Sequence, residues 1–263
     1  MQISLNTSKW WQNAWAALIF FTRLPLWRIY EPPPECYRAV VEFWPLAGWL
    51  TGLTMGAILY FGPMVMPPAL AIAAAIVARL LLTGALHEDG LADFFDGFGG
   101  GGSNRERILS IMKDSRIGTY GVLSLVAYFA ILFICLYSLP TRTAAFLVVA
   151  ADPFAKMLAG QIVQMMPYAR NESEAKAKVV YRKVSITGGI FLAFQGLLPA
   201  IPLLLWGGLT GSVQWLIFAP CLMMYVLYLK IWHTLRGYTG DCCGAIFLLV
   251  ELTVYITAVI TCK

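Results

Sequence analysis

An acidic run between residues 86 and 97 is the part of the sequence with the clearest capacity for chemistry. It holds four of the chain's 14 acidic residues, which are Glu88, Asp89, Asp93 and Asp96. If the run is helical, an advance of about 100° per residue places Asp93 and Asp96 within about 40° of Asp89. The spacing therefore predicts three carboxylates on one face of a helix.

Three neighbouring carboxylates need a cation, because like charges repel and an unpaired charge near hydrocarbon is costly. Carboxylate oxygens favour Mg²⁺, Mn²⁺ or Ca²⁺ over zinc, and Mg²⁺ is usually held by one or two carboxylates together with substrate phosphates. We therefore expect Asp89, Asp93 and Asp96 to bind Mg²⁺ and a phosphate- or diphosphate-bearing substrate. The alternative is a solvated acidic loop, which the i, i+4, i+7 spacing disfavours.

His87 directly precedes these carboxylates and is one of only two histidines. Because an imidazole titrates near pH 6.5, His87 is a candidate general base. A hydrogen bond from His87 to one of the carboxylates is an equally good interpretation.

A second polar cluster, at residues 112–121, is suited to binding phosphate oxygens. Lys113 offers a point charge and Arg116 a two-pronged guanidinium. Asp114 is either a further metal ligand or a partner that orients Arg116. The alternative is that these basic residues only anchor a cytoplasmic loop at the membrane surface, because such loops are rich in Lys and Arg. The intervening glycines, Gly97 and 99–102, form either a phosphate cradle or a flexible connector.

Charged residues recur within and beside the later apolar segments. Asp241 precedes the last of them, where it can cap the helix, complete the metal site, or do both. Asp152 and Lys156 lie inside one segment, and their i, i+4 spacing predicts an ion pair close to the substrate cavity. Glu251 also lies inside an apolar segment.

The composition indicates which kind of fold must position these residues. Of 263 residues, 59% are hydrophobic and only 13% are charged, whereas an average soluble domain has about 25% charged residues. Long apolar runs supply the excess, so the fold class is an all-α, polytopic integral membrane bundle. A nucleic-acid partner is not expected despite the net charge of +5, because the basic residues lie in short loops without a continuous basic face.

Seven segments are long and apolar enough to span a membrane, and the shorter segment 10–22 is expected to lie in the interface. The spans are predicted at 43–62, 68–86, 119–138, 143–166, 186–206, 214–230 and 244–262. Basic residues concentrate in alternate loops, which predicts a cytoplasmic N-terminus, cytoplasmic polar loops and Lys263 on the far side. Residues 1–263 are expected to form a single transmembrane catalytic domain in contact with membrane lipids.

Five short motifs together resemble the cobalamin synthase family, adenosylcobinamide-GDP ribazoletransferase. Their order and spacing match that family across nearly the whole chain. The motifs are Phe21-Thr22-Arg23-Leu24-Pro25, Trp44-Pro45-Leu46-Ala47-Gly48, His87-Glu88-Asp89-Gly90-Leu91-Ala92-Asp93 with Asp96-Gly97, Met112-Lys113-Asp114-Ser115-Arg116-Ile117-Gly118, and Thr239-Gly240-Asp241 with Gly244-Ala245.

The resemblance implies a Mg²⁺-dependent enzyme of the bacterial inner membrane. Such an enzyme joins adenosylcobinamide-GDP to α-ribazole or its 5′-phosphate and releases GMP. It implies Asp89, Asp93 and Asp96 around the metal. The remaining oxygens would be bound by Lys113 and Arg116, with Arg23, Asp114 and Asp241 as further substrate-binding candidates. The base that takes the hydroxyl proton is His87, Glu88 or an aspartate of the cluster, and the sequence does not choose.

Two other functions remain open at this point. A CDP-alcohol phosphotransferase or a prenyltransferase also uses membrane-embedded aspartates with Mg²⁺, although the first is expected to show D-G-x-x-A-R. A divalent-cation transporter would need acids near the midplane of the spans, where only Asp152 and Glu251 are found. The sequence does not determine the oligomeric state, and a homo-oligomer is among the arrangements it allows.

Overall fold

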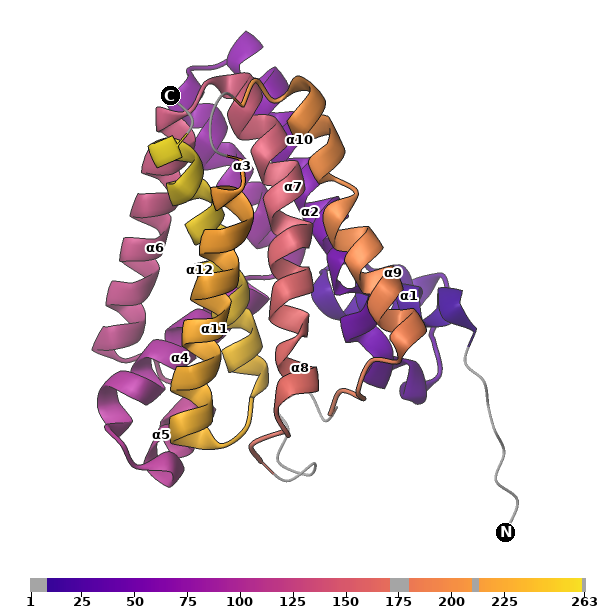
Figure 1. The fold of residues 1–263 in the computed structure, drawn as a ribbon, viewed down its shortest axis with the longest axis vertical. Helices are drawn as coiled ribbons and strands as arrows, with labels where there is room; N and C mark the ends of the chain where they lie inside the picture. The colour runs from indigo at the N-terminus through magenta and orange to yellow at the C-terminus, as the bar shows by residue number, and fades with distance from the viewer. Residues whose placement is uncertain (1–8, 171–179, 210–212, 262–263) are drawn as a thin grey trace.

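The computed structural model describes residues 9–170, 180–209 and 213–261, and every regular element in these ranges is a helix (Figure 1). The α-helices are α1 (Trp10–Phe21), α2 (Trp44–Phe61), α3 (Pro68–Thr83), α4 (Leu86–Gly101), α5 (Arg105–Lys113), α6 (Thr119–Ser138), α7 (Thr141–Gly160), α8 (Ile162–Met165), α9 (Ile186–Leu197), α10 (Ala200–Trp206), α11 (Trp215–Leu235) and α12 (Gly240–Thr261). Short 3-10 helices cover Leu26–Arg28, Pro34–Phe43 and Gly62–Met64. Lys263, predicted to lie on the far side, falls outside the described ranges.

The fold class is confirmed, whereas the count of seven spans is not. Within the described residues, five helical segments are long and apolar enough to cross a membrane: Thr119–Ser138, Thr141–Met165, Ile186–Trp206, Trp215–Leu235 and Gly240–Thr261. A sixth is added if α3 and α4, which meet at 89°, form one bent span. The predicted segment 43–62 does form a helix, α2, but it is not among these spans. Helix α1 also forms as predicted, and its position in the interface remains a prediction.

The bend between α3 and α4 explains why the predicted span 68–86 is shorter than expected. Gly84 and Ala85 both adopt the left-handed conformation, with φ of 65° and 57°, which ends α3 at Thr83. Its 16 residues rise about 24 Å, less than the roughly 30 Å of a hydrocarbon core. The bend turns the acidic run on α4 away from the direction of α3.

Gly84 is required at this bend for two reasons. Its φ is unfavourable for any residue with a Cβ, and the space that a Cβ would need is occupied by the Arg23 side chain. Gly84→Ala should therefore destabilise the protein by at least about 1–2 kcal/mol, measured as thermal unfolding in detergent. Ala85→Gly is the matched control, because it removes left-handed strain and should cost nothing. Equal loss in both variants would contradict this account of the bend.

Helices α7 and α12 form the centre of the bundle (Figure 1). In each, 72% of the most apolar stretch is buried, against 22–28% in α6, α9–α10 and α11. The outer helices therefore turn apolar side chains outward, as lipid-facing helices do. Gly48, Gly52 and Gly56 of α2 meet the backbone of α7, since a Cβ on Gly52 would lie 3.2 Å from the carbonyl oxygen of Val148. This small-residue contact holds α2 directly against α7.

Most of the glycine-rich run is helical, so neither prediction holds for Gly97 and Gly99–Gly101, and only Gly102 lies beyond α4 in the turn that follows it. Gly97 and Gly99–Gly101 are helical and lie on α4. A Cβ on Gly97 would lie 2.7 Å from Cγ of Met112, and one on Gly99 would lie 2.5 Å from the Tyr120 ring. The glycines thus let α5 and the start of α6 pack closely on α4.

Candidate functional site

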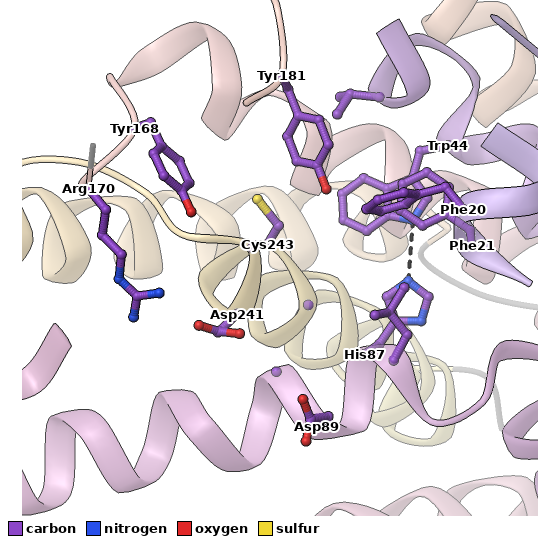
Figure 2. A pocket seen from close by; sticks show the side chains of 15 residues that line it. Phe20, Phe21, Trp44, His87, Asp89, Tyr168, Arg170, Tyr181, Asp241 and Cys243 are labelled. Atoms are coloured by element: carbon purple, nitrogen blue, oxygen red, sulfur yellow. Dashed lines mark hydrogen bonds between the residues drawn. The ribbon is translucent and has the colours of Figure 1, made fainter. Parts of the chain in front are cut away.

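A cavity of about 120 Å³ lies where the starts of α4 and α12 meet α1, α2 and the loop after α8 (Figure 2). The side chains that define it are Phe20, Phe21, Trp44, His87, Asp89, Tyr168, Arg170, Tyr181, Asp241 and Cys243. It therefore joins the first part of the acidic run to the segment at Asp241, about 150 residues later in the chain.

Two glycines bring α4 and α12 into contact at the cavity. A Cβ on Gly90 would lie 3.1 Å from the carbonyl oxygen of Asp241, and a Cβ on Gly244 would lie 3.1 Å from that of His87. Any larger residue would push the helices apart. The contact places Asp89 and Asp241 on the lining of the same cavity (Figure 2).

The predicted helical face of α4 exists, but the three aspartates on it have different surroundings. Asp89 is exposed into the cavity, Asp93 is half-buried one turn further on, and Asp96 is buried. The carboxylate of Asp96 accepts hydrogen bonds from the backbone N–H groups of Gly118 (2.7 Å) and Gly121 (2.8 Å). Asp96 thus satisfies free N–H groups at the start of α6.

The structure does not assemble the three aspartates into one metal group. Among the described residues, no three His, Cys, Asp or Glu side chains are arranged to hold an ion. The pair Asp89 and Asp241 nevertheless suits Mg²⁺, which is commonly held by one or two carboxylates with substrate phosphates completing its octahedron. Their oxygen donors come from two helices and face one cavity. Magnesium binding itself remains a prediction.

His87 and Glu88 point to different parts of the molecule. The His87 ring lies in the cavity lining, stacked on Trp44, whose Nε1–H donates to His87 Nε2 at 3.4 Å. The hydrogen bond at Nε2 therefore comes from an indole and not from a carboxylate. Glu88 is buried and faces Arg79, at 3.8 Å between Nη2 and Oε1, on the side of α4 away from the cavity.

The phosphate-binding candidates of the second cluster are divided in the same way. Asp114 and Arg116 pair with each other at 2.7 Å, and the Arg116 side chain is 87% exposed. The hydrogen bonds from Arg116 lower the pKa of Asp114 to about 2, and this pairing is the role of orienting partner that the sequence predicted for Asp114. Lys113 instead lines an open hollow that shares Tyr168 and Arg170 with the cavity.

Arg23 and Asp241 also differ from expectation in detail. Arg23 covers the α3–α4 bend, where its backbone N–H donates to the Leu82 carbonyl at 2.7 Å, and it does not line the cavity.

The cap of α12 is Thr239, whose Oγ1 accepts from the N–H of Cys242 at 3.2 Å. Asp241 lies one residue inside the helix, so the capping prediction was wrong by two residues.

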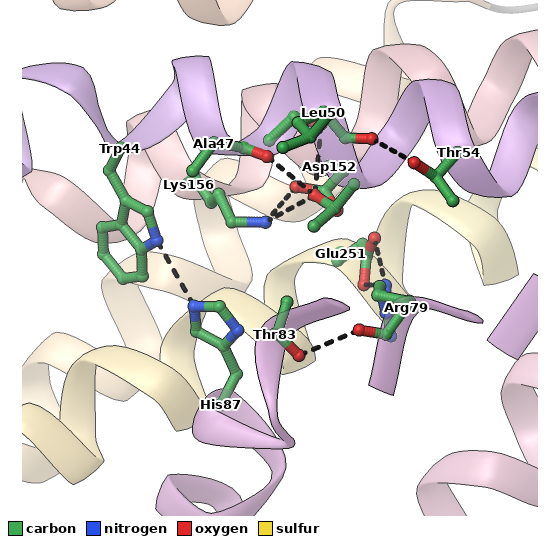
Figure 3. Close-up of polar contacts among 12 residues, drawn as sticks. Trp44, Ala47, Leu50, Thr54, Arg79, Thr83, His87, Asp152, Lys156 and Glu251 are labelled. Atoms are coloured by element: carbon green, nitrogen blue, oxygen red, sulfur yellow. Dashed lines mark hydrogen bonds and ion pairs between the residues drawn. The ribbon is translucent and has the colours of Figure 1, made fainter. Parts of the chain in front are cut away.

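Two buried ion networks lie behind the cavity (Figure 3). The predicted pair of Asp152 and Lys156 is confirmed, and Thr51 Oγ1 donates to Asp152 at 2.7 Å. Lys156 lies 4.0 Å from the centre of the Phe247 ring, which in turn contacts His87. The pair is therefore one aromatic layer away from the cavity, not on its surface.

The second network centres on Arg79, a residue that the sequence analysis passed over as part of an apolar span. Arg79 Nη1 donates to both carboxylate oxygens of Glu251, at 2.8 and 2.7 Å. Two tyrosines complete the network: Arg79 Nη2 donates to the Tyr128 hydroxyl at 2.5 Å, and the Tyr255 hydroxyl donates to Glu251 Oε1 at 2.7 Å. A charged residue inside a membrane span usually pairs with another group in the bundle. This rule alone could have predicted that Arg79 has a buried partner.

Tyr168, Arg170 and Tyr181 were also missed as lining residues. All three lie between α8 and α9, in a loop whose basic residues the sequence analysis used only to orient the chain. Their residue types were only weak evidence that they line a cavity, because aromatic and basic residues are common next to any span.

A match to a known protein family decides which family this chain belongs to. The family model of cobalamin-5-phosphate synthase matches residues 13–259. The chain belongs to the cobalamin-5-phosphate synthase family. This confirms the resemblance that the five motifs predicted.

Relatives within the cobalamin-5-phosphate synthase family are similar over almost their whole length. The adenosylcobinamide-GDP ribazoletransferase of Vibrio parahaemolyticus is 35% identical over 92% of this chain and 90% of its own. The proteins of the same name from Mesorhizobium japonicum and Leptospira interrogans are 38% and 30% identical, over 92% and 94% of this chain and 90% and 94% of theirs. No solved structure matches the chain.

Proposed function

We propose that this enzyme transfers the adenosylcobinamide-phosphate moiety of adenosylcobinamide-GDP to α-ribazole or α-ribazole 5′-phosphate and releases GMP, and that the reaction occurs at the cavity between α4 and α12. The proposal rests on one observation, the meeting of Asp89 and Asp241 in a cavity that also presents Arg170 and aromatic rings. Full-length relatives named for this reaction support it. The family match does not favour the CDP-alcohol phosphotransferase, prenyltransferase or transporter alternatives.

The residues of the cavity suit the displacement of a nucleotide from a diphosphate. Asp89 and Asp241 would hold Mg²⁺, with Asp93 on the next turn of α4. When bound, the ion would neutralise negative charge on the diphosphate. Arg170 and Lys113 are the cations that reach phosphate oxygens from the cavity and the adjoining hollow. Asp114 and Arg116 need not touch the substrate.

A ribose hydroxyl of the ribazole must lose a proton as it attacks phosphorus. Asp89 and Asp241 are the carboxylates on the cavity lining, so the better base is whichever of them does not bind the ion. His87 Nε2 already accepts a hydrogen bond from Trp44, and Glu88 faces Arg79. Of the bases left open by the sequence, we therefore favour an aspartate.

The proposed orientation places this end of the bundle in the cytoplasm of a bacterium, with the protein in the inner membrane and the N-terminus inside. Arg105, Lys113 and Arg170 all line the hollow beside the cavity, as the positive-inside rule requires of a cytoplasmic end. Both substrates would then arrive from the side on which they are made. Contact with lipids and assembly into a homo-oligomer remain predictions.

The test is product release by the purified protein in detergent or proteoliposomes. Adenosylcobinamide-GDP, α-ribazole and Mg²⁺ together should yield GMP and adenosylcobalamin in equal amounts, and removal of Mg²⁺ with a chelator should stop the reaction. CDP-alcohols and prenyl diphosphates should yield no CMP and no diphosphate. GMP formation without a cobalamin product, or metal uptake without any nucleotide, would reject the proposal.

A further inference from the structure

The cavity has a continuous aromatic wall that the proposed chemistry does not explain. Tyr168, Tyr181, Phe20, Phe21 and Trp44 line it. Tyr238 is buried behind Tyr168 and Tyr181, with ring centres 5.4 and 6.5 Å away, and Tyr181 meets Phe20 at 6.1 Å. Beside Phe20, Phe21 stacks on Trp44 at 5.2 Å with an angle of 10° between the rings. Phosphate and metal binding need none of these rings, so they point to a separate ligand group.

The size of the cavity limits that group to one small ring system. Its volume of about 120 Å³ is close to that of an engineered cavity of about 150 Å³ that binds benzene. A corrin macrocycle or a whole nucleotide is several times larger. A flat heteroaromatic base, which is larger than benzene, is therefore the most of either substrate that the cavity could take up.

Polarity separates the two bases that the reaction offers, guanine and the dimethylbenzimidazole of ribazole. Figure 2 shows Phe20, Phe21 and Trp44 together at one end, while Arg170, Asp241 and Asp89 lie toward the other. Guanine carries several hydrogen-bonding groups, and burying them among rings would leave them unpaired at a cost. Dimethylbenzimidazole on the ribose keeps one free ring nitrogen as an acceptor and is otherwise apolar, so burying it among rings costs less.

We propose that this aromatic end binds the benzimidazole base of the ribazole acceptor, and that the guanine nucleotide of the donor lies outside it, along the hollow of Lys113 and Arg170. The inference rests on the proposed function, since it assigns one of that reaction's substrates to part of the same site. With the base against the faces that Phe20 and Tyr181 present to the cavity, the ribose would extend toward Asp89 and Asp241, where its hydroxyl would meet the diphosphate. The wall therefore orients the acceptor.

Steady-state kinetics with each substrate varied in turn test this assignment. Tyr181→Leu and Phe20→Leu should each raise KM for α-ribazole about 5- to 100-fold, the loss expected when one stacking ring is removed. KM for adenosylcobinamide-GDP should change less than about twofold. Tyr225→Leu is the matched control, because Tyr225 is exposed on α11 and stacks only on Tyr228 among the aromatic rings described. It should leave both constants unchanged.

Direct binding gives a second measurement that does not depend on turnover. Titration calorimetry should detect α-ribazole binding without the donor, weakened by Tyr181→Leu, whereas the matching purine nucleoside should bind at least tenfold more weakly. A rise in KM for the donor alone, or preferred binding of the purine, would instead assign the wall to guanine and overturn the inference. Unchanged constants in both variants would also overturn it. If the wild-type protein showed no turnover, that result would count against the proposed function. Binding of α-ribazole would still test whether the aromatic wall binds its base.

Discussion

Replacing Asp89 with asparagine should lower kcat for GMP release by about 10²- to 10³-fold, the usual loss when one electrostatic contact to the reacting centre is removed. Asparagine keeps the shape of the side chain but removes its charge. Because Asp89 is exposed into the cavity, the substitution should leave thermal stability unchanged. The Mg²⁺ concentration needed for half-maximal rate should rise at the same time.

Two further variants separate catalysis from general effects of lost charge. Glu31→Gln removes an exposed carboxylate outside the cavity lining and should leave the rate unchanged. Asp96→Asn replaces one of the two oxygens that accept from the Gly118 and Gly121 N–H groups with an NH2 donor and should therefore lower the unfolding temperature, with a loss of about 1–3 kcal/mol. If Asp89→Asn kept near-normal activity, the proposed metal pair would be wrong.

The second large effect concerns stability, at the pair of Arg79 and Glu251. Arg79 is 2% exposed and Glu251 is fully buried, so Arg79→Leu leaves a carboxylate without its bidentate partner inside the bundle. Breaking a buried pair in this way typically costs about 3–5 kcal/mol. We expect a clear fall in the midpoint of thermal unfolding in detergent, and a similar fall for Glu251→Leu.

A double-mutant cycle identifies the cause of that loss. Arg79→Leu combined with Glu251→Leu removes both charges and should recover part of the stability, because an apolar pair can replace a buried ion pair at little cost, although Glu88, 3.8 Å from Arg79, still loses its cation. Arg116→Leu is the control for an ion pair at the surface, and its effect should be small because Arg116 is exposed. Additive losses in the double variant would contradict a direct coupling of the two residues.

The parts of the fold predicted correctly depend on local pattern. Apolar length placed α6 at 119–138, and the i, i+4 rule identified the Asp152–Lys156 pair. The end of α3 was missed because a left-handed Gly–Ala step leaves no mark in hydropathy. The partner of Glu251 was missed because Arg79 lies 172 residues earlier in the chain, a distance over which sequence spacing carries no geometric information.

The candidate site shows the same division between local and distant information. Helical spacing correctly put Asp89, Asp93 and Asp96 on one helix. It could not show that the N-terminus of α6 engages Asp96, or that α12 brings Asp241 to Asp89, since both contacts depend on how the helices pack. The glycines of α4 were misinterpreted for the same reason, because their role is visible only in the helices that touch them.

The 89° bend has a consequence for how the two substrates meet. If α3 runs along the bilayer normal, α4 lies nearly flat, and its acidic residues stay at one depth, level with the lipid headgroups. A bulky donor adsorbed on the bilayer can then reach them by sliding within the plane, while a small nucleoside arrives from the water above. The donor would then reach the site by diffusing over the membrane surface and not through the whole volume of the cell.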